Sequence, residues 1–167
     1  PCITFDSVSN KVLIFYAEGT ASNYGAVIVG TVSGSSISFG TPYIWASWET
    51  VTNTATFDSN SNKVVLAYKR YVSGVGYYGE LVVGSVSGDT VNFGSPQTFH
   101  STNPGLWPES LLFNPNNNRI YLFYCLVPGP YTGKVYIGSV SGNTVNFDMD
   151  KTFSGPSQND SVSLVSP

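Results

Sequence analysis

The stretch "FDSNSNKVVLAY", from Phe57 to Tyr68, decides the fold because the chain writes it three times. The first copy, "FDSVSNKVLIFY", opens at Phe5, and the third copy, "FNPNNNRIYLFY", opens at Phe113. Repetition of this kind marks a repeat architecture, in which each copy is one supersecondary unit that buries its apolar face against its neighbours.

Other landmarks follow this motif in each copy, and they recur at steps of 54 residues. They are Gly30, Gly84 and Gly138; Phe39, Phe93 and Phe147; and Trp45, Phe99 and Phe153. The tail "SVSLVSP" repeats the start of a copy. We therefore expect one continuous repeat domain, with repeats at 1–49, 50–105 and 106–157 and the start of a fourth at 158–167.

Each copy predicts four short strands. In the second copy the first strand is "TATFD", and the unbroken apolar run "KVVLAY" is typical of a strand covered on both faces. The third strand, "ELVVGSV", holds a glycine that suggests a bulge or close backbone packing, and the fourth, "TVNFG", alternates as a half-buried strand does. Helical spacing is absent from the sequence, so the predicted fold class is all-β.

Four antiparallel strands in a repeat of about 50 residues describe a propeller blade. The sequence therefore predicts three four-stranded antiparallel propeller-type blades plus the first strand of a fourth. Three blades do not close a ring, because closed propellers have at least four. We expect the chain to be completed by other copies of itself or by further repeats of a longer chain. A β-trefoil is the alternative fold, but a trefoil would finish at three copies.

The segments "FDSNSNKVV", "VGSVSG" and "VNFGSP" resemble a tandem repeat family of marine phage and bacterial proteins. The resemblance implies a β-propeller-type fold and a location on an extracellular or virion surface. It brings no catalytic residues with it. The third copy departs from the pattern, with "NPNNN" in place of "DSNSN" and "FDMD" in place of "FGSP".

Composition limits the class of protein. Hydrophobic residues make up 41% of the chain, enough for a sizeable core, whereas charged residues make up only 10%. A net charge of −3 argues against nucleic-acid binding, which needs a basic surface. Apolar runs are too short for membrane insertion. The chain begins at Pro1, without an initiator Met or signal sequence, and reads as a mature or excised piece of something longer.

One edge of the predicted blades carries nearly identical turns, and the opposite edge carries links and loops that vary in length and content. Varied loops on a uniform scaffold are where specific binding usually lies, and aromatics with a polar tip suit sugar rings or a protein partner. The predicted glycan- or receptor-binding residues are Trp48, Tyr71, Tyr77, Tyr78, Trp107 and Tyr131. The alternative is that these rings fill gaps between blades, as we expect of Trp45.

Signs of catalysis or metal binding are weak. His100 is the only histidine and is expected in a hydrated loop. The run Asp58–Asn62 resembles the start of a calcium loop, but Lys63 stands where glycine is needed, so an Asx-type hairpin turn explains it better. A fragment of a propeller glycosidase is a minor alternative; its carboxylates would be Asp6, Asp58, Glu49 and Glu109. We predict a non-enzymatic protein with no metal and no cofactor.

The ends of the chain suggest assembly. The tail has the sequence of a first strand but lacks a second, so we expect it to pair outside its own blades, through Val162, Leu164 and Val165. Cys2 and Cys125 are either unpaired small apolar side chains or an inter-subunit bridge. Asn159 opens a lone glycosylation sequon. The predicted function is a structural and adhesive repeat module; the alternative is a purely structural subunit of a head-to-tail fibre or filament.

Overall fold

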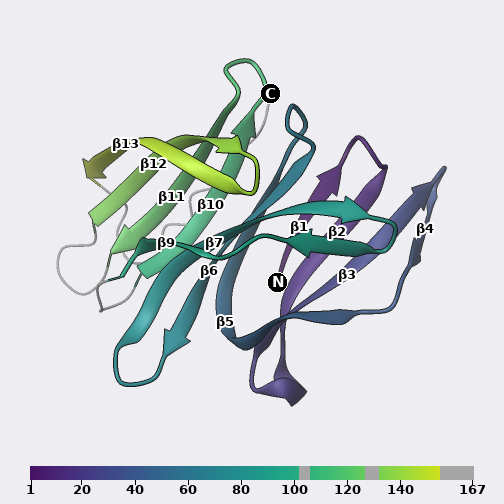
Figure 1. The fold of residues 1–167 in the computed structure, drawn as a ribbon, viewed down its shortest axis with the longest axis horizontal. Helices are drawn as coiled ribbons and strands as arrows, with labels where there is room; N and C mark the ends of the chain where they lie inside the picture. The colour runs from purple at the N-terminus through teal and green to yellow at the C-terminus, as the bar shows by residue number, and fades with distance from the viewer. Residues whose placement is uncertain (102–105, 127–131, 155–167) are drawn as a thin grey trace.

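In the computed structural model, which describes residues 1–101, 106–126 and 132–154, the chain is all-β and its paired strands are antiparallel (Figure 1). The strands form a nine-stranded and a four-stranded sheet. One short 3-10 helix, η1 (Gly19–Ala21), lies between two strands. None of the helical structure in these residues is long and apolar enough to cross a membrane.

The strands follow the sequence repeat and divide into three units. Unit 1 contains β1 (Cys2–Asp6), β2 (Lys11–Glu18), β3 (Tyr24–Ser33), β4 (Ser36–Phe39) and the start of β5 (Tyr43–Asp58). Unit 2 contains the rest of β5, β6 (Lys63–Val72), β7 (Gly76–Ser87), β8 (Thr90–Phe93) and β9 (Gln97–His100). Unit 3 contains β10 (Leu106–Asn114), β11 (Arg119–Leu126), β12 (Thr132–Ser141) and β13 (Thr144–Ser154).

The three units share one strand register. In each unit the glycine of the third strand lies opposite an aliphatic residue of the second strand and a phenylalanine of the fourth. These sets are Val12, Gly30 and Phe39; Val64, Gly84 and Phe93; and Ile120, Gly138 and Phe147. A Cβ on Gly84 would lie 2.8 Å from the Phe93 ring. The close packing that the sequence suggested for this glycine is confirmed.

The first turn of units 1 and 2 is built by an aspartate. Asp58, which is 1% exposed, accepts hydrogen bonds from the backbone N–H groups of Asn60 at 2.9 Å and Ser61 at 3.0 Å. Asn62 follows with a φ of 54°, in the left-handed region that asparagine tolerates. Asp6 makes the equivalent bonds in unit 1. The predicted Asx-type turn is confirmed.

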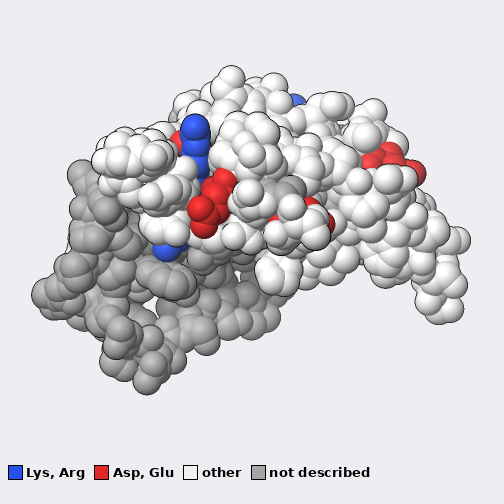
Figure 2. Space-filling model, turned by 90° about the horizontal axis from the view of Figure 1, so that it is seen from below, with Lys and Arg blue, Asp and Glu red and all other residues white. Residues whose placement is uncertain are grey.

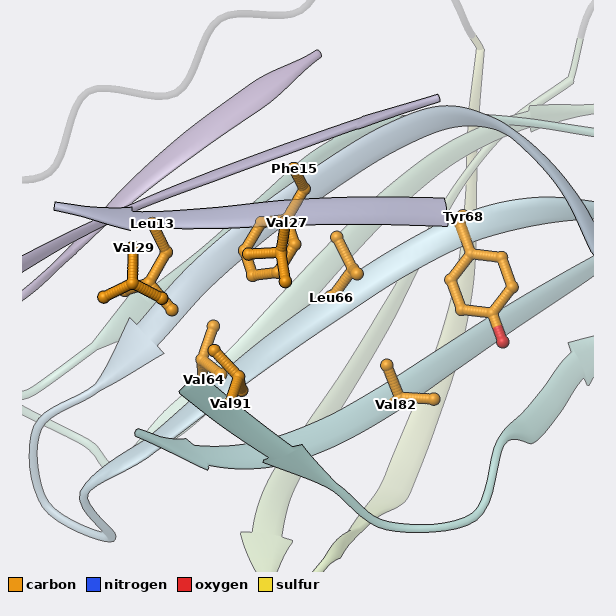
Figure 3. Packing of buried hydrophobic residues seen from close by; sticks show 9 residues of the cluster. All are labelled: Leu13, Phe15, Val27, Val29, Val64, Leu66, Tyr68, Val82 and Val91. Carbon is orange, nitrogen blue, oxygen red and sulfur yellow. The ribbon is translucent and has the colours of Figure 1, made fainter. Parts of the chain in front are cut away.

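The units stack face to face, and each junction has its own core. Figure 3 shows the first core, in which side chains of unit 1 point toward side chains of unit 2. Its members are Leu13, Phe15, Val27 and Val29 of unit 1, and Val64, Leu66, Tyr68, Val82 and Val91 of unit 2. We call the face that packs on the preceding unit the front face, and the opposite face the back face.

The second core joins the back face of unit 2 to the front face of unit 3. Its members are Val65, Ala67, Leu81 and Val83 of unit 2, and Leu111, Phe113, Ile120, Leu122 and Val145 of unit 3. Residues on β6 therefore alternate between the two cores, and the run from Val64 to Lys69 is buried without a break. The strand covered on both faces that the sequence predicted is found in unit 2.

The link between the first two repeats differs from the prediction. Residues 46–53 were expected to form a varied link, but they lie within β5, a strand of 16 residues. The first half of β5 pairs with β3 and its second half pairs with β6, with shifts of register between the two. This continuous pairing satisfies backbone groups that a loop would leave to water. The expected boundary between residues 49 and 50 falls inside the strand.

The end of unit 3 also differs from the other two. In units 1 and 2 the strand pairing breaks at 40–42 and 94–96, after β4 and β8. In unit 3 the strand β13 continues through the equivalent residues, which begin at Asp148. The predicted start of a fourth repeat, residues 158–167, lies outside the described residues. Within the part of the chain that is described, the sheets do not close into a ring.

Charged side chains are sparse on the face drawn in Figure 2, where a few blue and red groups lie among mostly uncharged residues. Ion pairs in the described residues include Lys11–Asp89 at 3.0 Å, which joins unit 1 to unit 2. The surface is thus covered mainly by neutral polar and apolar groups, as the 10% content of charged residues implies.

Candidate functional site

The aromatic residues expected in binding loops lie in strands. Trp48 is in β5, Tyr71 in β6, Tyr77 and Tyr78 in β7, and Trp107 in β10. The prediction that they occupy loops is wrong for these residues. The three tyrosines lie in strands because β6 and β7 stay paired as far as Val72 and Gly76. Tyr131 lies outside the described residues.

The β6–β7 hairpin places its three tyrosines on two faces. Tyr71 lies opposite Tyr77, and both share the parity of the back face of unit 2. Tyr78 lies opposite Arg70 and shares the parity of the front face. The adjacent pair Tyr77 and Tyr78, which the sequence grouped as one site, therefore points in opposite directions, because successive side chains alternate along a strand.

We call Tyr71 and Tyr77 the hairpin surface. The rings of Tyr71 and Tyr77 meet edge to face, with centroids 5.3 Å apart, and Tyr71 is 45% exposed. The ammonium nitrogen of Lys69 lies 4.4 Å from the centroid of the Tyr77 ring. Burial lowers the pKa of Lys69 from its ordinary value. The result is an aromatic step in which Tyr71 is exposed, Tyr77 is partly buried, and Lys69 lies beneath them at 5% exposure.

Trp48 lies in a charged network at the junction of units 1 and 2. The guanidinium carbon of Arg70 is 4.7 Å from the Trp48 ring, a cation–π contact, and Arg70 also pairs with Glu80 at 3.3 Å. Glu80 is buried and accepts a hydrogen bond from the Tyr68 hydroxyl at 3.0 Å. Burial and then the Glu80 charge raise the pKa of Tyr68 above its ordinary value. This packing supports the gap-filling alternative for Trp48.

Trp45 and its counterpart Phe99 fill equivalent positions at the two junctions. Trp45 contacts Tyr68 of unit 2 at a centroid distance of 5.1 Å, as expected of a residue that fills the gap between repeats. Phe99 contacts Tyr124 of unit 3 at 5.7 Å. His100 ends β9, with its ring 6.1 Å from Tyr124, so the prediction that it lies in a loop is wrong.

A pocket of about 260 Å³ lies where the first strands and first turns of the three units converge. The same three positions of each repeat line it: Thr4, Phe5 and Ser7; Thr56, Phe57 and Ser59; and Leu112, Phe113 and Pro115. The sequence analysis missed this site, because it assigned binding to the varied edge. The signal was present in the repeat phase, since strands at equivalent positions meet near one axis when units stack.

The carboxylates weighed for a glycosidase have structural surroundings. Asp6 and Asp58 are each 1% exposed and are engaged by their own turns. Glu49 lies in β5 opposite Tyr24. Glu109 lies in β10, but its side chain is outside the described set. Among the described residues, His, Cys, Asp and Glu side chains do not gather in groups of three or more.

Cys2 is a free thiol. Cys2 packs against the first core, and burial raises the pKa of its thiol to about 12. This environment suits a small apolar side chain, the first alternative that the sequence left open for Cys2. Cys125 lies in β11 and is half-buried. The expected assembly residues Val162, Leu164 and Val165, and the sequon residue Asn159, lie outside the described residues.

Comparison of the chain with protein-family models, with curated proteins and with solved structures finds no match.

Proposed function

We propose that the chain is a non-enzymatic structural and adhesive module of an extracellular or virion surface, and that it binds a glycan or a surface receptor through the hairpin surface. The observation that carries the proposal is the Tyr71–Tyr77 step, in which Tyr71 is 45% exposed and its ring meets the partly buried Tyr77 ring. These two rings lie outside both cores, on the β6–β7 hairpin. In this proposal the repeated parts of the units build the scaffold, and the hairpin presents the ligand site.

We further propose that the units are propeller-type blades. Three features support this: a common register, front-to-back stacking, and first strands β1, β5 and β10 that lie next to one another. A β-trefoil closes its hairpins into one barrel around one core. Two separate cores, one in each junction, favour blades. A chain of three blades is a segment of a larger array.

The chemistry of the hairpin surface suits a sugar. Aromatic faces pack against the apolar face of a sugar ring, and the phenol hydroxyls are available for hydrogen bonds to sugar hydroxyls. A protein receptor that presents apolar and hydroxyl groups offers the same features, and it is the other partner within the proposal.

The test is direct binding to immobilised glycans, including acidic ones, and to whole cells. Tyr71→Ala combined with Tyr77→Ala should weaken binding at least about tenfold, because stacked aromatics contribute about 1–3 kcal/mol when they are binding hot spots. Tyr78→Ala, on the opposite face of the same strand, is the matched control and should bind normally. Binding that survives the double substitution contradicts the proposal. A loss of binding accompanied by a large fall in melting temperature also contradicts it, because the two rings would then be part of the core.

A second role, as a purely structural subunit of a head-to-tail fibre or array, is favoured by a different observation. Large apolar side chains on the front face of unit 1 are exposed, among them Ile3 and Phe39. Contiguous exposed apolar patches mark interaction surfaces more often than chance. Pairing of the tail, residues 161–167, with another chain stays a prediction. Deletion of residues 157–167 tests it, because strand sharing requires that the truncated chain no longer assembles.

A further inference from the structure

The front face of unit 1 carries an apolar patch that is open to solvent. Ile3 is 65% exposed, Ile37 48% and Phe39 52%. The strand register places them on one face, because Ile3 lies opposite Ile14, and Phe39 lies opposite Gly30. Phe5 and Ile44, which are also exposed, share this face. The patch therefore spans β1, β4 and the start of β5.

The equivalent positions of the other two units are covered. Ile37, at 48% exposure, corresponds to Val91 at 5% and Val145 at 2%. Phe5, at 46%, corresponds to Phe57 at 8% and Phe113 at 7%. In units 2 and 3 the cover is the back face of the preceding unit. The two junctions therefore show that the front face of a unit binds the back face of another unit.

The open face already has the geometry of the covered ones. The Phe39 ring lies over Gly30, where a Cβ would come 2.9 Å from the ring. The Phe93 ring lies over Gly84 in the same way, and it meets Phe15 of unit 1 with ring centroids 6.1 Å apart. Phe39 needs no rearrangement to receive a partner of the same kind, and preorganisation of this type lowers the cost of binding.

A polar contact accompanies each covered face. The Tyr43 hydroxyl of unit 1 bonds the backbone N–H and C=O of Val91. One step later, the Gln97 side chain of unit 2 accepts from the N–H of Val145 at 2.7 Å and donates to its C=O at 3.3 Å. Ile37 is the equivalent residue of unit 1. Among the described residues, no side chain makes such a contact to the backbone N–H or C=O of Ile37.

From these contacts we infer that the front face of unit 1 docks the back face of a further unit of the same repeat. That unit carries glycine directly after its fourth strand and a hydrogen-bonding side chain three residues later. The inference rests on the repeat architecture proposed above and narrows the structural role, because it separates the units that can dock on this face from those that cannot. It does not depend on ligand binding by the hairpin surface.

Unit 3 of a second copy does not fit this description. A Cβ on Gly40 would lie 2.9 Å from the Asp89 Cβ of the next unit, and a Cβ on Gly94 would lie 2.8 Å from that of Asn143. Glycine therefore permits the close approach of successive units. The corresponding residue of unit 3 is Asp148, whose carboxylate pairs with Arg119.

The second requirement fails in unit 3 as well. Lys151 occupies the position of Tyr43 and Gln97, and an ammonium group donates hydrogen bonds but accepts none. The backbone N–H of a docked Ile37 would be left without a partner. The array is thus open at the front of unit 1 and blocked at the back of unit 3, and the partner is a unit built like unit 1 or unit 2.

Sedimentation velocity over a range of protein concentrations tests both halves of the inference. The unaltered chain should form no oligomers that depend on the front face of unit 1. A chain with residues 148–151 changed to the unit 2 sequence (Asp148→Gly, Met149→Ser, Asp150→Pro and Lys151→Gln) should form a growing series of oligomers, because a heterologous contact does not close on itself. Adding Phe39→Asp should abolish the series. Adding Val75→Asp, at an exposed residue away from the patch, should leave it intact.

If the unaltered chain forms oligomers and Phe39→Asp abolishes them, then the back face of unit 3 is not blocked and that half of the inference is wrong. If the unit 2 replacement prevents folding or stays monomeric, a tandem chain decides. A second copy of residues 1–52 is placed before Pro1, which keeps the spacing of the first junction and makes docking intramolecular. Phe39→Cys, with Cys2 and Cys125 changed to Ala, should be alkylated at least about tenfold more slowly in the tandem chain, in line with a docked fraction above nine-tenths. Equal rates would overturn the docking face, whereas the glycan test with Tyr71 and Tyr77 stands apart from either result.

Discussion

Units 1 and 2 carry nearly the same sequence and the same register, yet they differ in what they bury. The second strands "KVLIFY" and "KVVLAY" pair alike with their neighbours, but the run in β6 is covered on both faces and the run in β2 mainly on one. Phe5 is 46% exposed, whereas Phe57 is 8% exposed. The repeat motif therefore encodes pairing within a unit, and burial is decided by which units lie beside it, as in other repeat proteins.

The comparison is tested most strongly by truncating the same position in both units. Leu66 is fully buried in the first core, so Leu66→Ala should lower the free energy of unfolding by about 3–4 kcal/mol. Ile14 is its half-buried counterpart on the open front face, and Ile14→Ala should cost about 1 kcal/mol. Urea unfolding followed by circular dichroism measures both. Equal costs would show that unit 1 is covered after all.

A second test concerns the approach of successive units. Gly94→Ala should cost about 2 kcal/mol, because its Cβ would lie 2.8 Å from the Cβ of Asn143 in the next unit. Gly19→Ala is the matched control: no heavy atom lies within 4 Å of its added Cβ, and the change should stay within about 0.5 kcal/mol. A Gly94→Ala protein as stable as the control would mean that the junction tolerates a side chain there.

The smallest expected effect is a difference in alkaline stability. Burial raises the pKa of Tyr124 above its ordinary value of 10.0. Below pH 10 both folded and unfolded chains hold this proton, and as pH rises above 10 only the unfolded chain releases it, so stability is lost. Tyr124→Phe should therefore reduce the loss between pH 8 and pH 11 by up to about 1 kcal/mol. Tyr16→Phe, at the equivalent position on the open face, is the control; urea midpoints that shift equally in both variants would contradict the assignment.

Much of the fold could be predicted because its signals are local or periodic. The 54-residue step set the three units, Asp58 with Asn62 marked the turn, and Gly84 opposite Phe93 marked close packing. What escaped prediction depends on contacts between units. Residues 46–53 read as a polar, variable link, and only the pairing of β5 with both β3 and β6 makes them a strand.

The candidate site was predictable in its residue types but not in its directions. Tyr71 and Tyr77 were both among the residues that the sequence analysis proposed for binding, but it paired Tyr77 with Tyr78. Once the stretch is a strand, parity separates Tyr77 from Tyr78 and pairs Tyr77 with Tyr71 across the hairpin. The pocket at Phe5, Phe57 and Phe113 needed the stacking of all three units before it could be seen.

The long strand β5 has a consequence for how the molecule opens. Its 16 residues carry backbone hydrogen bonds of two units, so neither unit 1 nor unit 2 is able to fray without loosening the other. Units 2 and 3 share side-chain packing, but β9 and β10 are separate strands. In a hydrogen-exchange experiment the amides of β2, β3, β6 and β7 should behave as one cooperative foldon, with β10–β13 as a second that exchanges earlier. The protein is therefore expected to open as two cooperative parts, with units 1 and 2 together and unit 3 alone, although its sequence contains three repeats.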